Sequence, residues 1–291
     1  MKIFSAALGG LLTLAFCMAA EEPHFYVAPA APPDAAKFEV IPGPGIRYRM
    51  NEASATSEPW LDLNAWRYQR GLRKAKYDKL AAGTASLAAA EAFVFGADAI
   101  LNPLPPDAAD LEKMLAFLKT IDAPRLPEMA NIGVIDDHSP AVPEVLNLLS
   151  RRNLLYRVVS APDRNLNLNV KIGSPDFPVE STKNPSEFAA RVREKLGDEH
   201  RLVRLYGTST TTVYLTGDQS RARLYLLSYG KSRFPQTIRV RVLGHYTPVR
   251  FSGFETPSGA VMTDIEDTGD AAEFTIPAFT TLGVIDLEKK R

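Results

Sequence analysis

Three consecutive residues with side chains capable of acid–base chemistry, Asp136, Asp137 and His138, follow the apolar run 132–135 and precede Ser139-Pro140. An apolar run of this length is typical of a buried strand, and serine followed by proline is typical of a helix start. Open α/β sheets bind ligands at the carboxyl ends of their strands. A carboxylate pair beside an imidazole could bind sugar hydroxyls, hold a cation or exchange protons. The simpler alternative is a strand-to-helix turn in which the aspartates only cap backbone amides.

A second group alternates polar and aromatic residues at every other position: Glu58, Trp60, Asp62, Asn64, Trp66 and Tyr68. If this segment is one strand, all six side chains point to the same face. That mixture suits a saccharide, whose apolar ring faces stack on aromatic rings while carboxylates and amides bind its hydroxyls. The group also holds the only two tryptophans of the chain. The alternative is that the tryptophans are core residues and the acids pair with nearby arginines on the surface.

Glu58 and Asp62 fit poorly as a glycosidase pair. Two residues four apart on one strand have Cα atoms roughly 13 Å apart. Glycosidase carboxyls lie about 5–5.5 Å apart in retaining enzymes and about 6.5–9.5 Å apart in inverting ones. The sequence also contains no glycine-rich phosphate loop, no nucleophile elbow and no zinc-protease motif. We therefore predict neither a cofactor nor a metal ion.

The elements that would position these residues follow from hydrophobic periodicity. An alanine-rich helix over 86–95 closes at Gly96 and contains Glu91, which we expect to be buried with a raised pKa if it is unpaired. A strand, a helix and a second strand over 132–159 predict a right-handed parallel βαβ unit. Other α/β elements are predicted as a strand over 97–101, a helix beginning at Asp107, and a helix from Asn184-Pro185 to Gly197 with Glu187 in a capping box.

After residue 202 the hydrophobic period drops to two, and short alternating runs are separated by Gly, Pro and Asp, which predicts a β-sandwich. Its strands are expected at 211–215, 224–228, 237–242, 248–251, 261–265, 273–276 and 282–287. The predicted fold class is therefore an α/β domain of the flavodoxin or amidotransferase type followed by an antiparallel β-sandwich. The predicted divisions are a signal peptide over 1–20, a Pro/Ala-rich arm over 21–45, the α/β domain over 46–200 and the sandwich over 201–291.

The first twenty residues predict export. Lys2 is followed by an apolar stretch that is short for a membrane anchor, and small residues precede Glu21. Cleavage there would remove Cys17, the only cysteine, and would exclude disulfides and thiolate chemistry. A lipoprotein anchored through Cys17 is the alternative, although bulky Phe16 precedes the cysteine. With 34 basic and 34 acidic residues, the chain lacks the basic surface that a nucleic acid or an anionic membrane would require.

Residues 131–140 and 154–157 resemble the amidotransferase-like α/β domain that accompanies bacterial glycoside hydrolases of the β-galactosidase type. Residues 223–229 and 274–277 are similar to the small β-sandwich that ends such enzymes. The resemblance covers about 160 residues and implies catalytic carboxylates on a (β/α)₈ barrel, which needs at least ~200 residues. Only about 110 residues separate the signal peptide from Asn131. The segment 46–125 could therefore hold no more than the remnant of a barrel end.

The sequence thus predicts a secreted, carbohydrate-associated binding or assembly module derived from the non-catalytic part of a glycoside hydrolase, with an oligosaccharide or polysaccharide as partner. One alternative is an active glycosidase that uses Asp136, Asp137 or Glu58 in a cleft. The other is a structural subunit that forms a homo-oligomer. No nucleic acid is expected as a partner, and no membrane once the signal peptide is removed.

Overall fold

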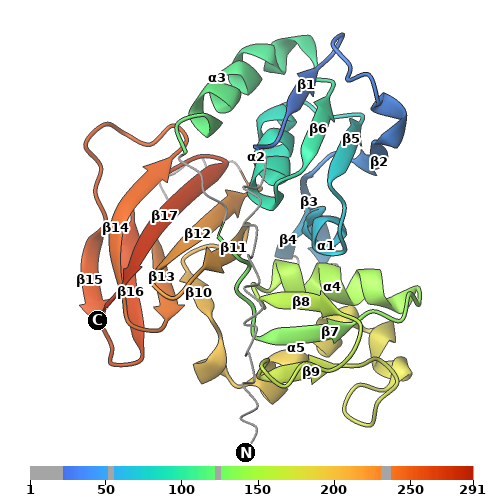
Figure 1. Ribbon diagram of the computed structural model, residues 1–291, viewed down its shortest axis with the longest axis vertical. Helices are drawn as coiled ribbons and strands as arrows, with labels where there is room; N and C mark the ends of the chain where they lie inside the picture. Colours follow the sequence, from blue (N-terminus) through green and yellow to red (C-terminus); the bar gives the residue numbers. More distant parts are fainter. Residues whose placement is uncertain (1–21, 52–55, 122–125, 231–236, 291) are drawn as a thin grey trace, which may run out of the picture.

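The computed structural model describes residues 22–51, 56–121, 126–230 and 237–290, without the side chains at 49–51, 56–58 and 185. Two parallel sheets with helices come first, and a β-sandwich made of two antiparallel sheets follows (Figure 1). This confirms the predicted α/β part followed by a sandwich. In the described residues the parallel strands form two separate sheets of four and three strands.

The first parallel sheet has the order β1-β6-β5-β2, with β1 Phe25–Val27, β6 Asp98–Leu101, β5 Lys74–Asp78 and β2 Glu39–Pro42. All its neighbouring strands are parallel. The segment interpreted as a Pro/Ala-rich arm therefore supplies two strands of this sheet. Short runs such as Val40-Ile41 pair with β5, and Ile41 is buried. The prolines lie in and around the turns between these strands, and for that reason the composition of the segment did not reveal the two strands.

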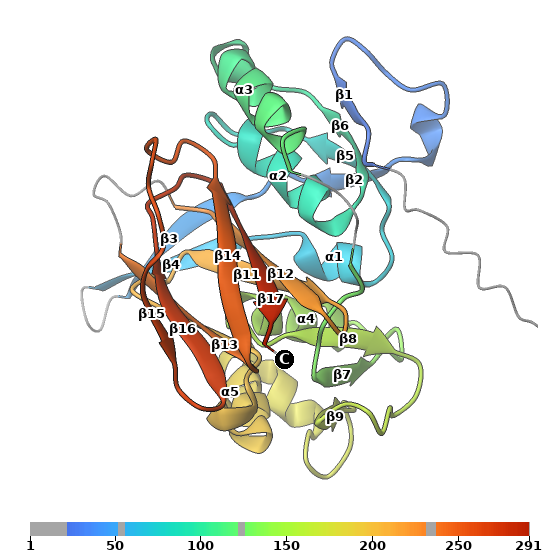
Figure 2. The ribbon, with the colours of Figure 1, turned by 60° about the vertical axis from the view of Figure 1, so that its left-hand side comes forward.

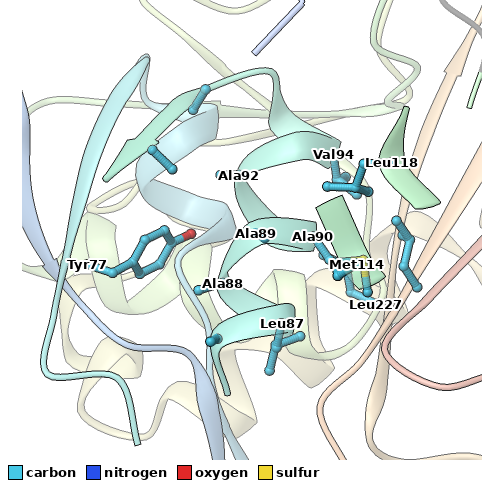
Figure 3. Packing of buried hydrophobic residues seen from close by; sticks show 14 of the residues in the cluster. Tyr77, Leu87, Ala88, Ala89, Ala90, Ala92, Val94, Met114, Leu118 and Leu227 are labelled. Carbon is cyan, nitrogen blue, oxygen red and sulfur yellow. The ribbon is translucent and has the colours of Figure 1, made fainter. Parts of the chain in front are cut away.

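Two helices cover the face of this sheet that is turned toward the sandwich (Figure 1). Helix α2, Ala85–Phe95, ends at Gly96 in the left-handed conformation with φ 68°. It is buried nearly all round because its alanines allow close approach on one side to β6 and on another to α3, Ala108–Leu118. Figure 3 shows α2 between Tyr77 of β5, Met114 and Leu118 of α3, and Leu227 of the sandwich.

A hairpin and a short helix are inserted between β2 and β5. The hairpin pairs β3, Gly45–Asn51, with β4, Thr56–Asp62, and helix α1, Ala65–Gln69, follows at once. The interpretation of 58–68 as one strand is therefore wrong beyond Asp62. Asn64 is the N-cap of α1, and an asparagine favours this position over a strand interior. Trp66 and Tyr68 consequently lie on a helix.

The second parallel sheet has the order β8-β7-β9, and its strands are β7 Ile132–Ile135, β8 Tyr156–Val159 and β9 Leu168–Val170. Its helices are α4, Ala141–Arg151, and α5, Pro185–Leu196. The predicted βαβ unit and the helix after Asn184 are confirmed, and Asn184 caps α5 by accepting from the Glu187 amide at 3.4 Å. Strand β9 was not predicted. Short 3₁₀ helices cover Ala35–Lys37, Pro105–Asp107, Val179–Lys183 and Asp198–His200.

The sandwich packs two four-stranded sheets face to face (Figure 2). Its core contains fully buried side chains from both sheets, including Val240 and Phe274 on one and Leu224 and Ile285 on the other. Every strand that the sequence predicted is present, and β10 is additional. One sheet contains β10 Val203–Tyr206, β13 Ile238–Leu243, β16 Ala271–Ile276 and β15 Thr263–Asp267. The other contains β11 Thr211–Gly217, β12 Arg221–Ser228, β17 Leu282–Lys289 and β14 Tyr246–Gly253.

Among the described helices, none has both the length and the apolar character needed to cross a bilayer.

Candidate functional site

The carboxyl end of β7 holds Asp136, whose side chain turns inward and is only 9% exposed. Its Oδ2 accepts a hydrogen bond from Arg70 Nε at 2.7 Å, and its Oδ1 accepts one from the His138 amide at 2.9 Å. Arg70 is the C-cap residue of α1. This ion pair therefore joins the inserted helix of the first unit to the strand end of the second sheet.

Asp137 and His138 are both exposed, although the His138 Nδ1 still lies 3.7 Å from the Asp136 Oδ1. Asp137 is exposed and accepts a hydrogen bond from the Ser139 amide at 2.9 Å, which holds the pKa of the Asp137 carboxyl below its usual range. The side chain of His138 is 84% exposed, and its backbone has φ 61°. The adjacent carboxylates thus occupy different surroundings: Asp136 is paired and nearly buried, whereas Asp137 lies in solvent.

Both tryptophans are half-buried and pack against the core of the second sheet, Trp60 from β4 and Trp66 from α1. Each carries an arginine over its ring. The Arg151 guanidinium carbon lies 3.4 Å from the centre of the Trp60 ring, and that of Arg67 lies 4.3 Å from the centre of the Trp66 ring. Stacking of this kind is a cation–π interaction. One face of each ring is therefore covered by the protein itself.

The other residues of the predicted saccharide strip lie apart from this group. Asp62 forms a bidentate ion pair with Arg47, with both N–O distances 2.6 Å. Asn64 is buried and donates from its side chain to the Pro42 carbonyl at 3.0 Å. The side chain of Glu58 lies outside the described part of the structure. The strip is therefore divided between a strand face, a helix cap and a helix.

The structure brings one subset of the predicted residues together where α1 packs on α4. We call this region the α1–α4 seam and define it by Trp60, Trp66, Arg70, Asp136 and Arg151. Asp137 and His138 form the exposed rim beside it. Sequence reasoning considered Arg70 only in the alternative in which arginines pair with the acids on the surface. It missed Arg151, because nothing in the local pattern shows that α1 and α4 are neighbours.

A buried polar cluster around Glu91 was also only partly foreseen. Its carboxylate is fully buried and accepts four hydrogen bonds: from the Asn64 amide at 2.6 Å, from Asn64 Nδ2 at 3.0 Å, from Tyr77 at 3.1 Å and from Tyr229 at 3.0 Å. Burial raises the pKa of Glu91, and these hydrogen bonds oppose the shift. Tyr229 follows β12, so the cluster ties α2 to the sandwich. We interpret it as structural, since hydrogen bonds from the protein already engage both carboxylate oxygens.

Glu128, in the connection before β7, is a further acid that sequence reasoning missed. Its Oε1 accepts from Gln69 at 3.1 Å, and its main-chain carbonyl accepts from Arg157. Burial raises the pKa of the Glu128 carboxyl. Through Gln69 and Arg70, the end of α1 thus contacts two acids of the second unit. Over the described residues, His, Cys, Asp and Glu side chains do not form any group of three suited to a metal ion.

Comparison with known proteins gives a likeness in fold only. The sequence matches no family model, and no curated protein is significantly similar to it. The fold is similar to α-L-fucosidase isoenzyme 2 from Paenibacillus thiaminolyticus, with a TM-score of 0.54 and 9% identity, over 78% of this chain and 63% of the fucosidase. The chain thus spans less than two thirds of that protein. Amy13B of Eubacterium rectale aligns with a TM-score of 0.18 at 10% identity, over 75% of this chain and 52% of the other, and this score does not indicate a shared fold.

The chain therefore shares its fold with part of that fucosidase. The narrower resemblance to enzymes of the β-galactosidase type stays a prediction.

Proposed function

We propose that this chain is a non-catalytic, carbohydrate-associated binding module that uses the rim of Asp137 and His138 as its ligand site. The observation that carries the proposal is the divergence of the two adjacent carboxylates. Asp136 is turned inward to Arg70, while Asp137 is exposed. Glycoside hydrolysis needs two carboxyl groups that flank one bond. The rim supplies one exposed carboxylate and an exposed imidazole, which can hydrogen-bond to hydroxyl groups.

The surroundings of the rim favour an oligosaccharide as the ligand. Strand ends of α/β sheets are common ligand positions, and the rim is held there by the Arg70–Asp136 ion pair. The half-buried tryptophans of the neighbouring seam offer apolar edges beside charged groups, as saccharide sites do. Export of the chain, proposed from its first twenty residues, would place it where extracellular polysaccharides occur.

Binding and catalysis are tested together on the purified chain starting at residue 21. A panel of neutral oligosaccharides is titrated while tryptophan fluorescence and released reducing sugar are followed. Trp60 and Trp66 are the only tryptophans and both belong to the seam, so binding at the adjacent rim is expected to change their emission. Binding without release is the expected result. Release of reducing sugar by the pure protein would contradict the non-catalytic role.

A matched pair of variants assigns the binding to the rim. Asp137→Ala is expected to weaken the binding at least about tenfold, the effect of losing one charged hydrogen-bond acceptor. Asp218→Ala is the control, because Asp218 also accepts from an amide two residues ahead, at 2.7 Å, in an exposed turn of the sandwich. If the two variants bind the oligosaccharide with equal affinity, the rim is not the ligand site.

A structural subunit is the second candidate, and the arginine-covered tryptophans favour it. If these rings serve only to hold α1 on α4, no panel member alters their fluorescence. Sedimentation of the same sample then decides whether the chain forms a homo-oligomer, as that role requires.

A further inference from the structure

A cavity of about 430 Å³ lies on the second unit, between the end of α4, the second half of α5 and the turn after α5. Its volume falls within the range of small-molecule sites, about 300–1,000 Å³. The buried side chains of Leu154 and Ala189 contribute to its lining. The cavity is distinct from the rim, because Asp137 precedes α4 whereas Arg152 follows that helix.

The walls of the cavity carry three arginines, Arg152, Arg193 and Arg201, against the two acids Glu194 and Asp198. Asp198 is engaged by Arg193, which donates to its two carboxylate oxygens at 2.7 and 2.5 Å. This hydrogen bonding lowers the pKa of Asp198 to about 2, so the carboxylate stays ionised. The Arg193–Asp198 pair is therefore neutral, and the lining has one more arginine than acid.

Arg201 is the least exposed of the three guanidiniums, with 13% of its side chain accessible. Its Nη2 donates to the Arg152 carbonyl at 3.3 Å, and its Nη1 lies 3.7 Å from Asp198 Oδ1. Its buried Nε has no hydrogen-bond partner among the described residues. Burial and the nearby charges of Arg193 and Arg204 lower the pKa of Arg201, although its guanidinium remains charged. The charged guanidinium of Arg201 thus belongs to the cavity wall, where an oxyanion would balance its charge.

Arg152 is the third arginine of the cavity lining. It is exposed, and none of the hydrogen bonds or ion pairs among the described residues involves its guanidinium. The paired N–H donors of a planar arginine guanidinium match the geometry of carboxylate, sulfate and phosphate groups. We propose that this cavity binds the oxyanion of a small ligand, with Arg152 and Arg201 as donors and the apolar floor in contact with the rest of the ligand. The site goes beyond the proposed function and does not depend on the rim.

Calorimetric titration of the whole chain with inorganic phosphate, inorganic sulfate, galacturonic acid and neutral galactose tests the proposal. The anions are expected to bind and galactose is not, and the affinity falls as sodium chloride is raised because the contact is ionic. Comparing the three anions identifies the source of the oxyanion. Stronger binding of galacturonic acid indicates a carboxylate-bearing sugar, whereas stronger binding of phosphate or sulfate indicates a phosphorylated or sulfated ligand.

Arg152→Gln is expected to weaken anion binding at least about tenfold, as loss of one charge-assisted hydrogen bond does. It is expected to leave the thermal midpoint unchanged, since the guanidinium makes no hydrogen bond or ion pair within the described residues. Arg191→Gln removes an exposed arginine from α5 that does not line the cavity, and is expected to bind like the parent chain. Failure of all three anions to bind, or equal weakening in the two variants, would show that the arginines only balance charges at the helix ends, and would overturn the proposal.

Discussion

The hydroxyl of Tyr229 is the contact by which the sandwich reaches the buried carboxylate of Glu91, at 3.0 Å. Tyr229→Phe removes this hydroxyl and leaves the ring in place. A hydrogen bond to a charged group contributes about 1.5–3 kcal/mol, so we expect the free energy of unfolding at pH 7 to fall by about 2 kcal/mol. The carboxylate keeps its other three donors, from Asn64 and Tyr77, which limits the loss.

The pH dependence of this loss follows from the direction of the Glu91 pKa. Burial raises that pKa above its value in the unfolded chain, so the folded state holds the proton more strongly. The stability from this group is present below the unfolded pKa and is lost as the pH rises through the folded pKa. Tyr229→Phe removes a hydrogen bond that lowers the folded pKa. The variant therefore loses more stability at neutral pH than at pH 4.

Urea unfolding at the two pH values, followed by circular dichroism, measures both effects. Tyr246→Phe is the control, because Tyr246 is also a buried tyrosine of the sandwich but its hydroxyl makes no hydrogen bond among the described residues. We expect this change to alter stability by less than about 0.5 kcal/mol. Equal losses in the two variants, or a Tyr229→Phe effect that is larger at pH 4, would refute the role given to the Glu91 cluster.

Two further substitutions, the first with a comparison variant, probe the seam and the strand that positions the rim. Arg70→Ala is expected to cost about 1–3 kcal/mol in urea unfolding because it leaves Asp136 nearly buried without its main donor. The comparison is Arg47→Ala, because the partner of Arg47, Asp62, is 31% exposed. This change should lower the free energy of unfolding by less than about 1 kcal/mol. A larger loss than that of Arg70→Ala would reverse our ranking of the two ion pairs. Gly133→Ala would bring a Cβ within 2.8 Å of the side chains of two neighbours, Leu166 and Asn169. A loss of about 1–3 kcal/mol in thermal or urea unfolding is expected from such overpacking, and an unchanged midpoint would show that β7 tolerates it.

Local patterns were sufficient for most elements with strong periodicity. Alternation identified seven strands of the sandwich, and the apolar stripe of 141–151 with the run before it identified the βαβ unit. Short strands without such a pattern were missed. β1 and β2 lie among prolines, and their membership of the first sheet depends on pairing with β6 and β5 far along the chain.

In the candidate site, too, some features follow from local patterns and others depend on residues far along the chain. The rim at the end of β7 was predictable, because a strand-to-helix turn fixes where Asp136 and Asp137 lie. The opposite orientations of the two side chains, Asp136 inward and Asp137 outward, could not be predicted. They depend on Arg70, which lies at the end of a helix 66 residues earlier in the chain. The strip from Glu58 to Tyr68 was interpreted with a strand period, whereas the N-cap at Asn64 starts a helix and separates its members.

By itself, the sequence determined the strongly patterned helices and strands, the change from α/β to sandwich and the position of the rim, because each depends on interactions between residues close together in the chain. The tertiary structure alone decided which charges are neutralised, which tryptophan faces are covered and where a cavity forms. Glu91 and Tyr229 illustrate the reason: they are 138 positions apart, and no local pattern encodes a contact that exists only once separate units have packed together.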